Sequence, residues 1–299
     1  MADTSGQADI RGLDVDKLAK GFAEEDLVLK NFCNVSSTSA REIRWYQKTA
    51  GFITGTTTSG MTSELIALGA NKAIASVAEQ SWTRNTSYVR QYFVESPTIS
   101  NADIKDTDID ILAANIRDLT RSVNNQVDKR IYDVITDNVS GTPFDGSTVT
   151  SNAATADGWD DTVTGDPIKD LMLAKTTIRL QSYNPEGAIL YIHPTEHSNL
   201  LQYLISVKGS SIPQFSSQKV MSGVVMEILG LNVAVSANAT TDYAVVFVPK
   251  VACTWKQFTP ITAVSINDPG IGTKIRVWEE GEAILTDPNA VCGITDTVV

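Results

Sequence analysis

The chain has 299 residues, of which 42% are hydrophobic and 20% charged, so it is long enough to bury a substantial core. Its formal net charge of −11, without a basic cluster, argues against tight, general binding to DNA phosphates. The three cysteines form no Cys-x-x-Cys pair, which argues against a disulfide framework and a zinc site. No apolar run approaches the ~20 residues that cross a bilayer and no secretion signal is evident, so we expect a soluble protein in a reducing compartment.

The first part of the chain is predicted to be extended. Residues 1–40 form an arm with one short helix at 14–23. Residues 42–47 and 73–78 are predicted to pair as a hairpin with the Gly- and Thr-rich run 51–60 at its tip, and aromatic and β-branched residues continue the strand character from 82 to 94. This segment has too few apolar residues to fold on its own, so we expect it to find its partner elsewhere.

The most regular pattern in the chain predicts one long helix over 106–137. Its apolar positions recur every three or four residues, at Leu112, Ile116, Leu119, Val123, Val127, Ile131 and Val134. Asp106, Asp108 and Asp110 lie in the expected first turn, where negative charge is favoured. The same three aspartates begin like a calcium loop, but the later positions lack the required glycine and glutamate.

The remainder of the sequence predicts an α+β body. Residues 138–166 are polar and indicate a loop between subdomains. Asp166 and Pro167 then cap a second helix, 188–192 is a buried strand, and a third helix runs from 194 to about 207. Strands are expected at 231–236, 243–248, 258–266, 274–278, 283–285 and 290–294. Gly270 and Gly272 lie in a hairpin turn more readily than in a phosphate loop, because a strand follows them.

Few residues could carry catalysis. His193 and His197, the only histidines, match the inverted zinc-protease pattern. Because Pro194 disfavours the helical conformation of His193, we expect this motif to be a strand-to-helix turn, with a metal-dependent hydrolase as the alternative. The aromatic residues of 41–95 could stack on bases or, as we favour, pack between strands or subunits.

Charge is distributed unevenly along the chain. Residues 41–95 carry 6 basic and 4 acidic side chains, whereas residues 96–165 carry 5 basic and 12 acidic ones. One interpretation of this distribution is that both segments simply expose their charges to solvent. The other is that the basic segment lies on the acidic helical region of a neighbouring subunit, which would steer association.

The order of these elements resembles that of the major capsid proteins of tailed viruses, which have the Hong Kong 97 fold. The ending IRVWEEGEAILTDPNA at 275–290 is similar to the closing strands of that family. The resemblance implies an N-terminal arm at 1–40, an extended loop at 41–95, an axial domain at 167–249, and a peripheral domain formed by 96–166 and 250–299 with a spine helix at 106–137.

The resemblance also implies a function without catalysis or cofactors. The protein would assemble into pentamers and hexamers of an icosahedral bacteriophage shell around double-stranded DNA, with no membrane contact and no sequence-specific DNA binding. A portal and decoration proteins are implied partners. Some relatives carry an N-terminal scaffolding segment of about a hundred residues, whereas only about forty residues precede the first predicted strand here, so a separate scaffold protein is expected as well. Assembly would occur in the host cytoplasm. A nanocompartment shell of the same fold, similar to encapsulins, is the alternative.

Ten residues are predicted to make contacts between subunits. Some relatives crosslink a loop lysine to an asparagine of a neighbour, and Lys48 and Lys72 are the candidates for such a bond here. The full set of predicted contacts is Arg44, Trp45, Tyr46, Lys48, Lys72, Arg84, Arg90, Asp106, Asp108 and Asp110.

Overall fold

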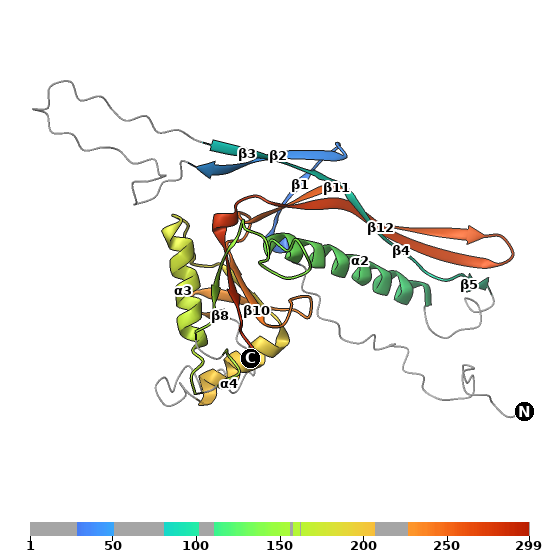
Figure 1. Cartoon of the computed structure of the whole chain (residues 1–299). Coiled ribbons are helices and arrows are strands. Elements are labelled where there is room, and N and C mark those ends of the chain that lie inside the picture. Colours follow the sequence, from blue (N-terminus) through green and yellow to red (C-terminus); the bar gives the residue numbers. More distant parts are fainter. Residues whose placement is uncertain are drawn as a thin grey trace, which may run out of the picture.

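The computed structural model describes residues 29–50, 81–101, 111–155, 158–161, 163–206 and 227–298. These ranges contain two larger sheets, a separate two-stranded ribbon and the helices α2 (Ile111–Ile135), α3 (Pro167–Leu180) and α4 (Pro194–Ser206) (Figure 1). The expected helix at 14–23, the tip at 51–60, the strand at 73–78 and the start of the long helix at 106–110 lie outside the described residues.

A five-stranded sheet packs on the long helix. Its order is β1-β11-β12-β4, with β5 also paired to β12; β1 is parallel to β11 and the other pairs are antiparallel. The predicted apolar stripe of α2 is confirmed for Val123, Val127 and Ile131, which are all buried, whereas Ile116 is 40% exposed. The strands are β1 (Asn34–Ser37), β4 (Arg90–Glu95), β5 (Ile99–Ser100), β11 (Cys253–Asp268) and β12 (Gly272–Leu285).

A six-stranded sheet of order β6-β13-β10-β7-β9-β8 forms the second layer. It is buried on both faces: Ile189 and Tyr191 of β7 share a core with α2, while Leu190 and Ile192 share one with α3 and α4. This explains why β7 reads as a continuous apolar run. The strands are β6 (Thr150–Ala153), β7 (Ile189–Ile192), β8 (Glu227–Ile228), β9 (Leu231–Val235), β10 (Tyr243–Phe247) and β13 (Val291–Thr295).

Short-range signals fix the ends of the helices. Asp166 accepts a hydrogen bond from the Lys169 amide at 3.2 Å and Pro167 is the first helical residue of α3, as predicted. At the end of α2, Asp137 has a φ of +49°, and the amides of Asp137 and Asn138 bond back to Val134 and Asp133. This Schellman arrangement satisfies the last carbonyl groups of the helix.

The turn at 268–272 is a hairpin, as expected. Gly270 has a φ of +84°, which other residues rarely adopt, and the Ile271 amide donates to the Asp268 carbonyl at 3.1 Å. Two short 3-10 helices, η1 (Leu29–Phe32) and η2 (Pro288–Ala290), complete the described elements.

Several expectations for strands were wrong. The described partner of β2 (Glu42–Ala50) is β3 (Ser81–Tyr88), with Gln47 opposite Thr83, where we expected residues 73–78, which lie outside the described residues. Residues 272–285 form one continuous strand where we expected two, because buried acidic residues at its centre hide its strand character. Strand β6 lies inside the expected polar loop, and β13 pairs with β10 in the six-stranded sheet instead of staying with the tail.

Candidate assembly interface

The ribbon formed by β2 and β3 extends away from the two larger sheets (Figure 1). Side chains alternate between its two faces. Ile43 and Gln47 are buried on one face, where Trp45 is half-buried. The opposite face, here called the outer face, carries Arg44, Tyr46, Trp82, Arg84 and Tyr88, all of them exposed.

The outer face combines large aromatic area with positive charge. Tyr46, Trp82 and Tyr88 are 64%, 54% and 66% exposed, values that leave most of each ring in water. Tyr46 lies directly opposite Arg84 in the strand register. Tyrosine, tryptophan and arginine are the residues most enriched where proteins bind one another. The outer face is therefore suited to protein contact.

The predicted aromatic set does not form one stacking platform. Trp45 lies on the face opposite Tyr46, and Tyr92 points inward against Trp255, with 6.0 Å between ring centroids. Phe93 is exposed, but on β4. The expectation that aromatic residues of this segment pack between strands is confirmed for Tyr92, which contacts Trp255.

Within the chain, one outer-face cation already has a partner. Arg44 Nε lies 2.6 Å from Glu42 Oε1, two residues away on the same strand, and this contact lowers the pKa of the Glu42 carboxyl. Both side chains are exposed, so solvent screens the pair and it contributes little to stability. No ion pair to Arg84 is found within the described residues.

The base of the ribbon is held by a fully buried carboxylate, Glu282 on β12. Its Oε1 accepts hydrogen bonds from Arg130 Nη2 of α2 at 2.6 Å and from Ser87 Oγ of β3 at 3.2 Å. Arg90 Nε of β4 lies 3.2 Å from Glu282 Oε2. Arg90, which we predicted as a contact between subunits, thus belongs to an anchor inside the chain.

The carboxylate of this anchor is fully buried, whereas Arg130 and Arg90 are 24% and 57% exposed. Burial raises the pKa of the Tyr92 hydroxyl to about 12, and the nearby Glu282 charge adds to the effect. Because electrostatic interactions are stronger away from water, the Arg130 and Glu282 pair holds the spine helix, the sheet and the ribbon base in one arrangement.

The N-terminal end of the described chain has a second anchor. Lys30 of η1 pairs through Nζ with the buried Glu279 of β12, and that ammonium lies 5.6 Å from the centre of the Trp255 ring. The Lys30 amide donates to Asp128 Oδ1 of α2 at 3.3 Å. Burial raises the pKa of Asp128 to about 6.

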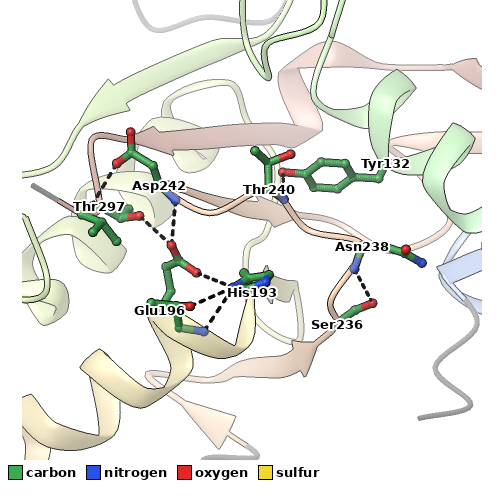
Figure 2. A network of polar contacts seen from close by, with 10 residues as sticks. Tyr132, His193, Glu196, Ser236, Asn238, Thr240, Asp242 and Thr297 are labelled. Atoms are coloured by element: carbon green, nitrogen blue, oxygen red, sulfur yellow. Dashed lines mark hydrogen bonds and ion pairs between the residues drawn. The ribbon is translucent and has the colours of Figure 1, made fainter. Parts of the chain in front are cut away.

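His193 and Glu196 lie at the start of α4, as expected for a strand-to-helix turn (Figure 2). His193 Nδ1 accepts a hydrogen bond from the Thr195 amide at 3.2 Å, which is the role of an N-cap. Glu196 is fully buried and accepts from the Asp242 amide at 2.7 Å, while its other oxygen lies 3.7 Å from His193 Nδ1. Over the described residues, no three histidine, cysteine or carboxylate side chains gather in a metal-binding group.

The same network connects the six-stranded sheet to the long helix. The Thr240 amide donates to the Tyr132 hydroxyl of α2 at 3.1 Å (Figure 2). Asn238 donates from Nδ2 to Asn125 of the same helix at 2.5 Å, and its amide donates to Ser236 Oγ at 3.2 Å. These bonds hold the loop before β10 on the spine helix.

The structure leaves part of the predicted contact set undescribed. Lys72, Asp106, Asp108 and Asp110 lie outside the described residues, and for Lys48 only the backbone position in β2, opposite Trp82, is described. Sequence reasoning missed Glu279, Glu282 and Arg130. The available signal was the run Glu279-Glu280-Gly281-Glu282 in an otherwise apolar tail, since buried acids require basic partners.

Among the helices that the structure describes, none is long and apolar enough to span a membrane. A search of curated proteins finds no match.

Solved structures that superpose on this chain include phage capsids and a virus-like particle. The chain superposes on a chain of Mycobacterium phage Che8 with a TM-score of 0.61 at 15% identity, over 87% of this chain and 86% of that one. For the capsid of cyanophage P-SCSP1u the TM-score is 0.64 at 13% identity, over 94% of this chain and 93% of that one. For a virus-like particle from Pyrococcus furiosus the TM-score is 0.56 at 13% identity, over 93% of this chain and 94% of that one.

These similarities show a fold of the Hong Kong 97 type. The family model described as phage capsid protein matches residues 82–294, more than half of the chain, and the chain belongs to this family. It is a major capsid protein of a bacteriophage, and its place is the virion capsid. The nanocompartment alternative is not better supported, because the family match is to phage capsids.

Proposed function

We propose that this protein builds an icosahedral shell of pentamers and hexamers around double-stranded DNA, and that the outer face of the β2–β3 ribbon lies on the neighbouring subunit. The observation that carries the proposal is the exposure of Tyr46, Trp82 and Tyr88 beside Arg44 and Arg84 on a ribbon that protrudes from the body. Exposed aromatic and arginine side chains of this density favour burial against a partner.

The partner surface is proposed to be acidic. The chain carries −11 overall while residues 41–95 are net positive, so the ribbon is complementary to most of the remaining surface. Each exposed ion pair is weak, of about 0–1 kcal/mol. Repetition over a closed symmetric lattice sums many such contacts, so weak interfaces suffice for a stable shell.

We propose an assignment of domains that follows the two sheets. Residues 1–40 act as the N-terminal arm and 41–95 as the extended loop, while the five-stranded sheet and the spine helix make the peripheral domain. The six-stranded sheet with α3 and α4 makes the axial domain. The pairing of β6 and β13 in that sheet supports moving these two strands from the peripheral to the axial domain.

The shell acts mechanically and without catalysis. DNA is enclosed without sequence-specific binding, which fits the absence of a strongly basic region in the sequence. A separate scaffold protein, a portal and decoration proteins are proposed partners, and assembly takes place in the host cytoplasm.

Charge reversal of the outer face tests this proposal. The variant Arg44→Glu with Arg84→Glu is expected to remain folded, with an unchanged unfolding midpoint, and to form no shells. Lys129→Glu with Lys169→Glu reverses the same amount of charge at exposed sites on α2 and α3 and controls for net charge. The proposal would be contradicted if the ribbon variant still formed shells and these shells had the same salt sensitivity as those of the natural protein.

A further inference from the structure

Two of the three cysteines, remote in sequence, are neighbours in the fold. Strand β1 pairs in parallel with β11, with Asn34 opposite Thr254 and Val35 opposite Trp255. Cys33 and Cys253 immediately precede these pairs, so they lie at adjacent positions of the two chains. Both are buried in the same core cluster, at 4% and 2% exposure, so both side chains point to the same side.

The geometry suits a covalent bond. Adjacent strands lie about 4.8 Å apart, inside the range of about 4.4–6.8 Å between Cα atoms that disulfides span. The Cys33 thiol donates to the Leu29 carbonyl at 3.7 Å, and the neighbouring Cys253 thiol raises the pKa of Cys33. No third ligand accompanies the pair in the described part of the chain, which argues against a metal.

We propose that Cys33 and Cys253 form a reversible intrachain disulfide site that fastens the N-terminal arm to β11. In the reaction a small-molecule disulfide is the oxidant. The Cys33 or Cys253 thiolate attacks it and expels one thiolate, giving a mixed disulfide. The second cysteine, after losing its proton, attacks the protein sulfur of that bond and expels the other small thiolate. Two protein thiols are oxidised and one small disulfide is reduced to two thiols.

The state of the thiols determines when the bond forms. The contact with Cys253 and burial raise the pKa of the Cys33 thiol, so the closed structure holds little thiolate. Strand β1 has four residues and lies at the edge of its sheet, so it opens locally at lower cost than the whole fold. Oxidation therefore follows opening of the arm, and closure then protects the bond from reductants.

The disulfide would raise the stability of the folded protein substantially. It joins residues 33 and 253 and encloses most of the chain in one loop. Cross-links that close long loops restrict the unfolded state most. We expect the unfolding midpoint of the oxidised protein to rise by roughly 5 °C or more.

The test uses the full chain, purified under reducing conditions and then equilibrated with oxidised and reduced glutathione at low denaturant. Intact mass spectrometry should show the loss of two hydrogen atoms, and digestion without reductant should give one linked peptide pair containing Cys33 and Cys253. Cys33→Ala and Cys253→Ala should each abolish the link and the shift in midpoint. Cys292→Ala, at an equally buried cysteine, is the matched control and should retain both.

Mapping of linked peptides in the natural sequence needs no variant, so the result does not depend on whether the alanine variants fold. A chain that keeps three free thiols under conditions in which the unfolded chain oxidises would overturn the proposal. Links that involve Cys292 as often as Cys253 would overturn it as well.

Discussion

Arg130 donates two hydrogen bonds to a single oxygen of Glu282, from Nη2 at 2.6 Å and from Nε at 3.2 Å. Arg130 belongs to the spine helix α2 and Glu282 to the C-terminal part of β12, which pairs with β4, the strand that follows the ribbon. The position of the ribbon base therefore depends in part on an ion pair to a fully buried carboxylate.

Removing the charge of Glu282 should destabilise the protein strongly. Glu282→Gln leaves the partly buried Arg130 without this anionic partner, and the loss of hydrogen bonds to a charged group typically costs about 1.5–3 kcal/mol. Urea unfolding of the monomer measures this loss. Glu280→Gln is the matched control: Glu280 is only half-buried and accepts from Thr259 at 2.7 Å, so we expect a loss of about 1 kcal/mol. Equal losses in the two variants would contradict the role of Glu282 as the anchor.

Asp128 should make stability depend on pH. Its pKa is raised from 3.8 to about 6, so as pH falls the folded protein binds a proton before the unfolded chain does. Protonation therefore stabilises the fold between about pH 7 and pH 4, by up to about 3 kcal/mol. The variant Asp128→Asn is neutral throughout and should lose this gain.

The measurement for Asp128 is the difference in unfolding free energy between the natural protein and Asp128→Asn across this pH range. The variant should be relatively more stable at pH 7 than at pH 4. Asp118→Asn, at an exposed position of the same helix, is the control and should leave the pH dependence intact. A difference for Asp128→Asn that stays constant with pH would count against the assigned burial effect.

Gly281 should not tolerate a side chain. A Cβ at this position would lie 2.5 Å from Trp255 Cζ2 and 2.8 Å from the Lys256 carbonyl oxygen. Gly281→Ala should therefore cost about 1–3 kcal/mol of unfolding free energy through overpacking. Adding Trp255→Phe, which removes the clashing ring atom, should make the double variant more stable than the sum of the single losses predicts. Strict additivity would show that the two residues are not in contact.

His193 and Glu196 should behave as structural residues. Loss of the cap in His193→Ala should cost about 1 kcal/mol, and treatment with a chelator should leave both the unfolding midpoint and assembly unchanged. Elemental analysis of the purified protein provides the direct check. Stoichiometric zinc would revive the hydrolase alternative.

Local signals were sufficient to predict many elements. The Asp166-Pro167 cap, the stripe of Val123, Val127 and Ile131, and the turn at Gly270 each depend on residues close in sequence. The HPTEH motif at 193–197 was also interpreted correctly as the start of a helix, because the effect of Pro194 is local.

Features that depend on distant pairing were predicted poorly. The buried Glu279 and Glu282 made β12 resemble two short strands, since their cationic partners lie far away in Lys30 and Arg130. The register of β2 with β3 and the adjacency of Cys33 to Cys253 follow from strand pairing over long separations, which periodicity does not reveal. The ion pair of Arg90 with Glu282 was missed for the same reason, and its role as a subunit contact stays a prediction.

We expect this chain to assemble into a closed shell through its own surface. Electron microscopy of the purified full-length protein, over a range of salt and protein concentrations and with nucleic acid content measured in parallel, tests it most directly. We expect closed particles of uniform diameter with pentameric and hexameric units. A protein that stays monomeric or dimeric under every condition would contradict the account.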